Sequence, residues 1–173
     1  MKIALVSDTH GLDDPRLPEL FRGCERVLHA GDMVRPPVLE SLARVAPVTA
    51  VRGNNDLDPC FAGLPETVVL PVGGLRVFLV HDLGARERPR PPASAALVRD
   101  RPDLVVHGHT HRPGTALHAG RLYVNPGSAG PRRFTLPRTA AILTVSGRRA
   151  RVAFFDLSGP RIEAHGAPME ADL

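Results

Sequence analysis

The sequence is poor in several chemically distinctive residues, and each shortage excludes a class of protein. Its two cysteines, Cys24 and Cys60, have neither the number nor the spacing of a disulfide framework or a thiolate metal site. We therefore expect a protein of a reducing compartment, the cytoplasm. No apolar run approaches the roughly 18 residues that cross a membrane. The N-terminal run Ile3–Val6 is also too short for a signal peptide, so we expect no membrane partner.

Aromatic residues and lysine are also scarce. Aromatic residues make up 4% of the chain, tryptophan is absent, and Lys2 is the single lysine. The net charge of +4 is therefore carried by arginine, and such a charge can suit a nucleic-acid-binding protein. However, no aromatic residues are interleaved with the densest basic stretch, 85–92 (ARERPRPP), as base stacking would require. We interpret this stretch as a solvated loop, with contact to a polyanionic substrate as the alternative.

The length and composition are those of an ordinary globular protein. The chain has 173 residues, of which 43% are hydrophobic and 23% charged. This suits one folded domain, 1–173, in which we expect residues 158–173 to form a C-terminal tail. In the first third, apolar runs predict strands at 1–8, 26–32 and 48–56. Amphipathic stretches between them predict helices at 13–23, capped by Asp14, and at 36–45. This βαβαβ order predicts parallel strands.

The pattern changes after about residue 64. Three pairs of apolar runs are each broken by a glycine-containing turn, which predicts β-hairpins over 66–82, 115–128 and 140–157. The expected turns are Gly73-Gly74, Ala119-Gly120 and Ser146-Gly147. A short helix at 93–100 and a strand at 103–110 complete the prediction. The fold class is therefore α/β of the α+β type, with a parallel first half and antiparallel additions.

Side chains that can bind metal follow five of the predicted strands. In open α/β sheets, ligands bind at the carboxyl ends of the strands. A lone Gly-Asp is usually a turn, and a lone strand-end histidine is usually hydrogen-bonded, but five such sets together favour a metal site. Residues two apart share one side of an extended backbone, so two of the sets could each supply a pair of ligands. The candidate ligands are Asp8, His10, Asp32, Asn54, His81, His109 and His111.

Seven ligands are too many for one tetrahedral zinc site, which takes four. They suit two metal ions that share a ligand. Asp32 is the natural bridge, because it follows a central strand and a carboxylate has two oxygens that can serve both ions. Mixed imidazole, carboxylate and amide ligands favour first-row transition ions over calcium or magnesium.

These motifs occur in the order and spacing of the calcineurin-like metallophosphoesterases, which the chain resembles up to about residue 157. The stretches SDTHG (7–11), GHTHRP (108–113) and YVNPGS (123–128) are most similar to the small bacterial and archaeal phosphodiesterases of that family. The resemblance implies a β-sandwich of mixed sheets flanked by helices (αββα). We interpret the NPGS turn as a buttress of the site, with a direct phosphate contact from Asn125 or Ser128 as the alternative. One ion would be held by Asp8, His10, Asp32 and His111, and the other by Asp32, Asn54, His81 and His109.

The resemblance implies hydrolysis of a phosphodiester by in-line attack of a hydroxide that bridges two divalent transition-metal ions. Manganese is the first choice, with nickel, iron, zinc or cobalt as alternatives. The substrate would be a small phosphodiester, including a nucleotide or a nucleic-acid end. Relatives often form dimers or tetramers, so a homo-oligomer is an open expectation. The alternative functions are a phosphomonoesterase, or a non-catalytic protein-binding scaffold like the retromer subunit of the same fold. The complete ligand set favours an enzyme.

The chain departs from the family pattern at two positions. Many members carry a histidine that protonates the leaving group where this chain has Asn55, and an amide cannot deliver a proton. We expect Asn55 and Asp56 to act in catalysis, and Asn54 and Asn55 to contact the substrate. Asp82 stands where glycine is common, and could reshape a turn or orient an imidazole. His29 and His107 are expected to face away from the ligands, because side chains alternate along a strand.

Overall fold

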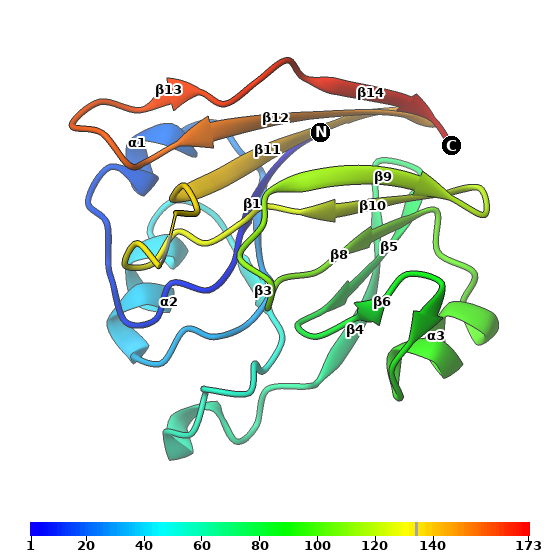
Figure 1. Ribbon diagram of the computed structural model, residues 1–173, viewed down its shortest axis with the longest axis horizontal. Coiled ribbons are helices and arrows are strands. Elements are labelled where there is room, and N and C mark those ends of the chain that lie inside the picture. The colour runs from blue at the N-terminus through cyan, green and yellow to red at the C-terminus, as the bar shows by residue number, and fades with distance from the viewer. Residues whose placement is uncertain (134) are drawn as a thin grey trace.

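The computed structural model describes residues 1–133 and 135–173, which form two mixed sheets packed face to face (Figure 1). Sheet A has the strand order β13-β12-β11-β1-β2-β3, with β14 also paired to β12. Its strands are β1 (Lys2–Val6), β2 (Arg26–His29), β3 (Val48–Ala50), β11 (Thr139–Ser146), β12 (Arg149–Asp156), β13 (Glu163–Ala164) and β14 (Met169–Asp172).

Sheet B has the order β4-β5-β8-β10-β9, and a short ribbon, β6-β7, lies outside both sheets. The strands are β4 (Thr67–Val72), β5 (Leu75–Val80), β6 (Gly84–Ala85), β7 (Arg88–Pro89), β8 (Leu104–Val106), β9 (Gly114–His118) and β10 (Arg121–Asn125). The helices are α1 (Leu17–Leu20), α2 (Pro36–Ala43), α3 (Ala93–Arg99) and the 3₁₀ helix η1 (Pro59–Phe61). No helix in the described part of the chain is long and apolar enough to cross a bilayer.

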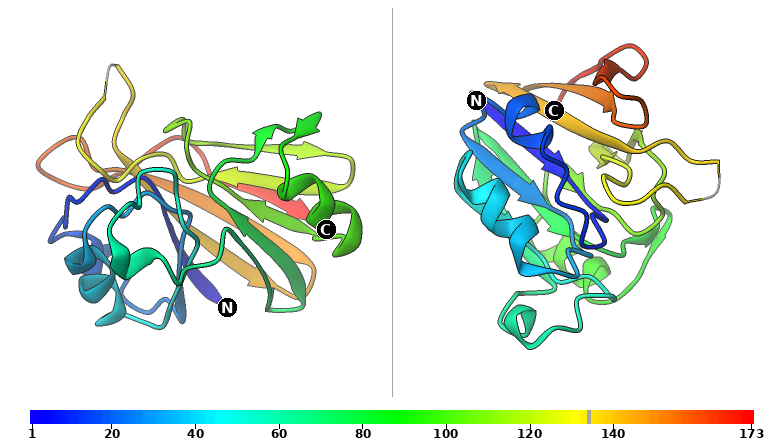
Figure 2. Two further views of the ribbon diagram at one scale, coloured as in Figure 1. Left: turned by 90° about the horizontal axis from the view of Figure 1, so that it is seen from below. Right: turned by 90° about the vertical axis from the view of Figure 1, so that its left-hand side faces the viewer.

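Helices cover the outer faces of both sheets, as Figures 1 and 2 show. Helices α1 and α2 pack on sheet A, and α3 packs on sheet B. Central strands therefore bury both of their faces. In β1, Ile3 and Leu5 point between the sheets whereas Ala4 and Val6 point toward the helices. This double burial explains the continuous apolar runs of the sequence, and the αββα sandwich is confirmed.

The predicted strand directions are confirmed for the first half and for the three hairpins. β1 pairs with β2 and β2 with β3, both in parallel. The second half is not wholly antiparallel as expected, because β8 pairs in parallel with β5 and β10. The hairpin between β4 and β5 turns at Gly73 and Gly74, whose φ angles of 55° and 96° suit the primed turns that match strand twist. The last hairpin turns at Gly147-Arg148, one residue later than predicted, because Ser146 still pairs with Arg149.

Two predictions about the ends of elements are wrong. Asp14 does not cap α1, which begins only at Leu17. The Asp14 carboxylate accepts from the backbone N–H of Arg16 (3.0 Å), in the turn before the helix, and from the guanidinium groups of Arg16 (2.7 Å) and Arg138 (2.8 Å). Residues 158–173 are not a tail, because β13 and β14 both pair with β12. The sequence did not predict β14 as a strand, because every second residue in it is charged. Its pairing with β12 in sheet A shows which of its faces is buried.

Candidate metal centre

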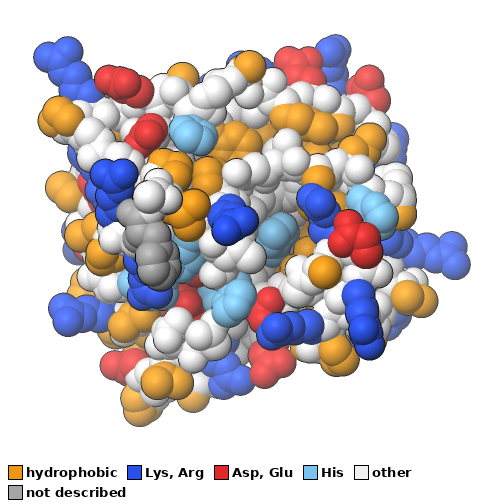
Figure 3. Space-filling view, viewed as in Figure 1, with side chains coloured by type: hydrophobic (Ala, Val, Ile, Leu, Met, Phe, Trp, Pro, Cys, Tyr) orange, Lys and Arg blue, Asp and Glu red, His pale blue; other side chains and the backbone are white. Residues whose placement is uncertain are grey.

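The loops that follow β1, β2, β3, β5 and β8 meet at one end of the sandwich. Backbone hydrogen bonds join them, from Asp8 N to Gly31 O (3.0 Å) in sheet A and from Gly108 N to His81 O (3.0 Å) in sheet B. Histidine side chains gather near the middle of the corresponding face, with acidic side chains beside them (Figure 3). The two sheets therefore contribute side chains to a common site.

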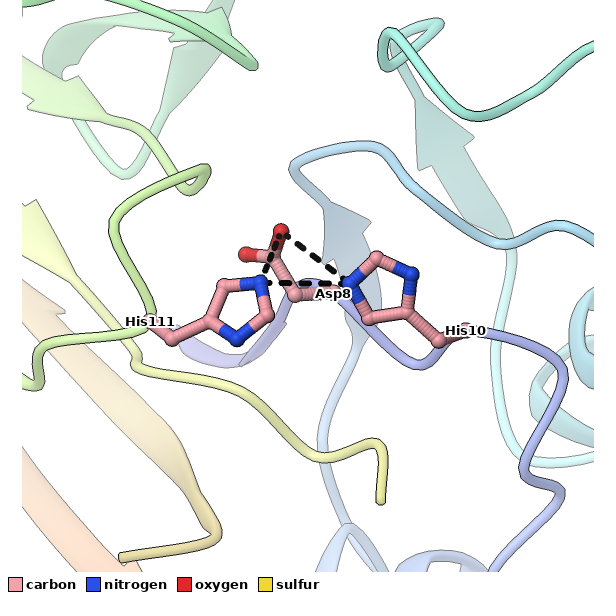
Figure 4. A group of neighbouring side chains, drawn as sticks. All are labelled: Asp8, His10 and His111. Carbon is pink, nitrogen blue, oxygen red and sulfur yellow. Dashed lines mark hydrogen bonds and ion pairs between the residues drawn. The ribbon is translucent and has the colours of Figure 1, made fainter. Parts of the chain in front are cut away.

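A first cluster contains Asp8, His10 and His111, whose side chains point toward one another (Figure 4). The Nε2 atoms of His10 and His111 are 3.1 Å apart, and Asp8 Oδ1 lies 3.2 Å from His111 Nε2 and 3.9 Å from His10 Nε2. Ligand atoms about 2.1 Å from one ion are about 3.0–3.5 Å from each other at tetrahedral or octahedral angles. The spacing of the cluster is therefore close to that of a metal coordination sphere.

A second cluster contains Asn54, His81 and His109. Asn54 Oδ1 lies 3.0 Å from His81 Nε2 and 3.0 Å from His109 Nδ1. Asp32 lies between the clusters, because its Oδ2 is 3.4 Å from His81 Nε2 and 3.8 Å from His10 Nε2. The seven candidate ligands thus fall into two groups joined by Asp32.

The carboxylate of Asp32 faces both clusters with one oxygen, not with its two oxygens as expected. Its Oδ1 accepts a hydrogen bond from the backbone N–H of Asn55 (2.8 Å), while the Asn55 amide donates to Oδ2 (2.6 Å). Asp8 also lies close enough to Asp32 and His81 to form a third possible ligand group with them. Both carboxylates are therefore central to the site.

The unsatisfied oxygen of Asp8 tests whether a cation fits here. Oδ2 of Asp8 accepts hydrogen bonds from Ser7 Oγ (2.7 Å) and from the backbone N–H of His109 (3.0 Å). Oδ1 is buried and accepts no hydrogen bond from the described residues. An unsatisfied buried carboxylate oxygen is costly, and an ion in the first cluster would satisfy it. The donor set of imidazole, carboxylate and amide groups also suits transition metals, so the residues fit the implied ions.

The protonation states of Asp8, Asp32 and His10 favour metal binding. Burial alone would raise the pKa of Asp8 and Asp32, but close contacts with charged imidazoles and hydrogen bonds from other polar neighbours outweigh it and leave both pKa values below the ordinary one. Burial, together with the charge of Arg133, lowers the pKa of His10. The carboxylates are therefore ionised and this imidazole is neutral at neutral pH, as ligands must be.

His81 behaves differently. Burial lowers its pKa, but Asp32 and Asp8 outweigh that effect and raise the pKa overall. Its Nδ1 is 2.7 Å from the carbonyl oxygen of Ala30, to which a protonated Nδ1 donates. Its Nε2 is then directed at Asn54 and Asp32. Such a fixed ring orientation is typical of metal-binding histidines.

Five of the candidate ligands have left-handed backbone conformations, which corrects the expectation of an extended backbone. Non-glycine residues are uncommon there, and such strain costs of order 1 kcal/mol per residue and clusters at functional sites. The paired motifs therefore do not act alike: Asp8 and His10 share one cluster, whereas His109 and His111 separate into two. The φ angles are 52° at Asp8, 46° at His10, 59° at Asp32, 68° at His109 and 58° at His111.

Two motif glycines are required by close approach of neighbouring chains. A Cβ atom at Gly53 would collide with the carboxylate and backbone nitrogen of Asp32. One at Gly108 would collide with the side chains of Ser7 and Asp8. Any side chain at either position would therefore displace a candidate ligand.

Asp56 does not have the position of a catalytic residue. Its carboxylate is buried and accepts hydrogen bonds from the backbone N–H groups of Asp32 (2.9 Å), Gly53 (2.8 Å) and Val34 (2.7 Å). These bonds hold the loop after β2 against the loop after β3, and the carboxylate does not enter either cluster. The expected catalytic role of Asp56 is therefore replaced by a positioning role. Asn55, by contrast, is exposed beside Asp32.

Several neighbours behave as the sequence predicts. Asn125 of the NPGS turn donates to Gly108 O (3.0 Å), and Ser128 Oγ donates to Asp8 O (2.8 Å), so this turn buttresses the site. Asp82 accepts from the backbone N–H of Gly84 (3.0 Å) and so shapes a turn, while His109 Nε2 is 3.8 Å away, beyond hydrogen-bond range. Ser7, which positions Asp8, was not predicted, because a serine at a strand end carries no distinctive signal.

Comparison with known proteins identifies the family of the chain. Residues 1–148 match the model of the calcineurin-like phosphoesterase superfamily domain. A probable metallophosphoesterase of Methanothermobacter thermautotrophicus is 30% identical over 154 residues, covering 86% of this chain and 88% of the relative. Probable metallophosphoesterase YsnB of Bacillus subtilis is 29% identical over 174 residues, covering 94% and 95%.

Solved structures share the fold. Vps29 of Entamoeba histolytica, complexed with Zn²⁺, superposes with a TM-score of 0.77 at 22% identity, covering 98% of this chain and 99% of that one. A structure described as a novel archaeal phosphodiesterase has a TM-score of 0.67 at 25% identity, covering 88% and 98%.

Proposed function

Because the chain belongs to the calcineurin-like phosphoesterase superfamily, we propose that it is a phosphodiesterase that uses two divalent transition-metal ions. The observation that carries the proposal is the grouping of all seven candidate ligands into two clusters joined by Asp32 Oδ2, with Asp8 Oδ1 left for a cation. When bound, such ions would lower the pKa of the attacking water and neutralise the phosphoryl oxygens.

The residues of the chain would bind and orient the substrate. Asn54 and Asn55 are the amides beside the two clusters, and the exposed Asn55 can donate to a phosphoryl oxygen when a substrate displaces its bond to Asp32. Neither amide can protonate a leaving group. Substrates with good leaving groups should therefore react fastest, and a phosphodiester is favoured over a phosphomonoester.

Manganese is the first candidate for the ions, and zinc, which the structural relative from Entamoeba histolytica holds, is an alternative. The substrate would be a small phosphodiester, a nucleotide or a nucleic-acid end, and the location would be the cytoplasm. A homo-oligomer is compatible with the fold.

A non-catalytic protein-binding scaffold is the second candidate, because Vps29 structures share the fold. Their identity to this chain is below 25%, so they carry the fold alone. The intact ligand set of this chain supports catalysis, since a scaffold has no need of four convergent imidazoles, three of which have a strained backbone.

Metal reconstitution tests the proposal. The protein is stripped with a chelator, reloaded separately with Mn, Fe, Co, Ni or Zn, and assayed with bis(p-nitrophenyl) phosphate and p-nitrophenyl phosphate. We expect metal-dependent hydrolysis with the diester preferred. Absence of hydrolysis with every metal would support the scaffold, and faster monoester turnover would overturn the diesterase assignment.

Substitution of the shared ligand gives an independent test. We expect Asp32→Asn to lower kcat/KM for the diester by more than about 100-fold. Losing a metal ligand should cost more activity than losing a residue that only hydrogen-bonds to a ligand, which typically costs about 10–100-fold. Metal content, measured by mass spectrometry, should fall together with activity. The exposed Asp13 supplies the matched control, because Asp13→Asn removes the same charge outside both clusters. Full activity in Asp32→Asn would contradict the role of this carboxylate.

A further inference from the structure

A small cavity of about 200 Å³ lies next to the metal centre and is not used by the proposed chemistry. Its wall includes Thr110, which lies between the candidate ligands His109 and His111 in the chain. The wall also includes Arg112, from the same loop, and Arg86, from the arginine-rich stretch 85–92. Figure 3 shows arginine and histidine side chains next to each other on this face.

The charge of this cavity is positive and unbalanced. Arg86 and Arg112 contribute two positive charges, and no carboxylate lines the cavity. Within the described residues, Arg112 has no ion-pair or hydrogen-bond partner, and Arg86 has only a long, exposed contact with Glu87 (3.8 Å). Such an exposed pair contributes little. By contrast, Arg90 of the same stretch is paired with Asp82 at 2.6 Å.

The size and lining restrict what could bind. Pockets for whole organic ligands usually measure about 300–1,000 Å³, so this cavity suits one small group. Of the two aromatic rings in the wall, Tyr123 is buried and offers no exposed face for a base to stack on, and His107 is half-buried. Thr110 Oγ1 accepts a hydrogen bond from Asn125 (3.0 Å), so its own hydrogen is free to be donated. Two guanidinium groups and a hydroxyl donor match a phosphate monoester, which carries close to two negative charges.

We propose that this cavity binds a second phosphate group of the substrate, so that the preferred substrate is a phosphodiester carrying a phosphate monoester near the scissile bond. The inference rests on the proposed phosphodiesterase function and adds the class of substrate. It assigns a role to Arg86 of the arginine-rich stretch, in contact with a polyanionic substrate.

Two substrates that differ by one phosphate test the inference. They are the p-nitrophenyl ester of thymidine 5′-phosphate and the same ester with a phosphate on its 3′-hydroxyl. We expect the second to have a kcat/KM about tenfold higher or more, mainly through a lower KM, as two charge-assisted contacts would give. The double variant Arg86→Gln/Arg112→Gln should bring the ratio between the two substrates close to one.

The matched control is Arg88→Gln, because Arg88 lies in the same stretch but not in the wall of the cavity. It should leave the ratio within about twofold of the wild type, as expected for an exposed charge. Equal kcat/KM for both substrates, or an equal loss for both in the double variant, would overturn the inference while leaving the phosphodiesterase standing. Hydrolysis of neither substrate would instead count against the proposed function.

A binding measurement covers the case of an inactive protein. Isothermal titration of the metal-loaded protein with thymidine 3′,5′-bisphosphate should give a Kd at least about fivefold lower for the wild type than for the double variant. Equal affinities would overturn the inference independently of catalysis.

Discussion

At the scale of the residue, His29 links the metal centre to the stability of the protein. It is completely buried, and burial lowers its pKa to about 3. Its Nδ1 accepts a hydrogen bond from the backbone N–H of Gly31 (3.2 Å), so the neutral ring carries its proton on Nε2 and donates it to Thr9 Oγ1 (3.1 Å). A second proton would break the bond to Gly31. The site therefore depends on a neutral His29 beneath its loops.

This burial predicts a pH dependence. In the unfolded chain His29 takes up a proton below its ordinary pKa of 6.5, whereas in the folded protein it stays neutral down to about pH 3. Stability is therefore lost as the pH falls below 6.5. Between pH 7.5 and 5.0, the free energy of unfolding of the metal-free protein should fall by about 2 kcal/mol more in the wild type than in His29→Gln. Urea titrations at both values measure this difference. His118→Gln, at an exposed position, should retain the wild-type slope.

At the scale of the element, β14 shows how an apparently polar segment is stabilised. Its alternate residues Met169 and Ala171 are half-buried against the core, as is the following Leu173, while Glu170 and Asp172 face solvent. β14 pairs with β12 along four residues. This strand therefore protects the edge of sheet A and covers part of the apolar core.

Removing this element should be costly. Deletion of residues 167–173 exposes β12 and is expected to lower the free energy of unfolding by about 2–4 kcal/mol, the value of three half-buried apolar side chains. Urea unfolding measures the loss. The matched control Glu170→Ala removes the ion pair with Arg149 (2.8 Å) but keeps the apolar contacts. It should cost less than about 1 kcal/mol. Equal losses in both variants would show that charge, not burial, anchors the strand.

At the scale of the whole molecule, the candidate metal centre joins the two sheets. Asp8, His10, Asp32 and Asn54 follow strands of sheet A, whereas His81, His109 and His111 follow strands of sheet B. Each cluster contains side chains from both sheets. Bound ions would therefore stabilise the packing of the sandwich as well as the strained loops.

Metal loading should raise the thermal stability. At a metal concentration about 100-fold above Kd we expect Tm to rise by about 5–10 °C, and a chelator should reverse the change. Differential scanning fluorimetry measures the shift, which needs no catalytic activity. His109→Ala should show a smaller rise, and His118→Ala, which lies away from both clusters, should show the full rise. An identical rise in the two variants would place the stabilising ion elsewhere.

The sequence by itself determined the features that depend on near neighbours. Apolar runs predicted the parallel strands, glycine-containing turns predicted the hairpins, and the seven candidate ligands were found because each follows an apolar run. These signals are local, because backbone preference and side-chain alternation extend over only a few residues. They could not show that β14 completes sheet A, since its contacts with β12 are remote and its charged face dominates the pattern.

The family resemblance implied how the ligands are shared, but only the tertiary structure shows the contacts that divide them. His10 and His111 are 101 positions apart in the chain yet meet at 3.1 Å, and His109 and His111, two positions apart, separate into different clusters. The tertiary structure also shows that Asp56, expected to be catalytic, accepts hydrogen bonds that support the loops. Arg86 lines the small cavity together with Thr110. The physical reason is that left-handed turns and contacts between the sheets, not strand periodicity, direct these side chains.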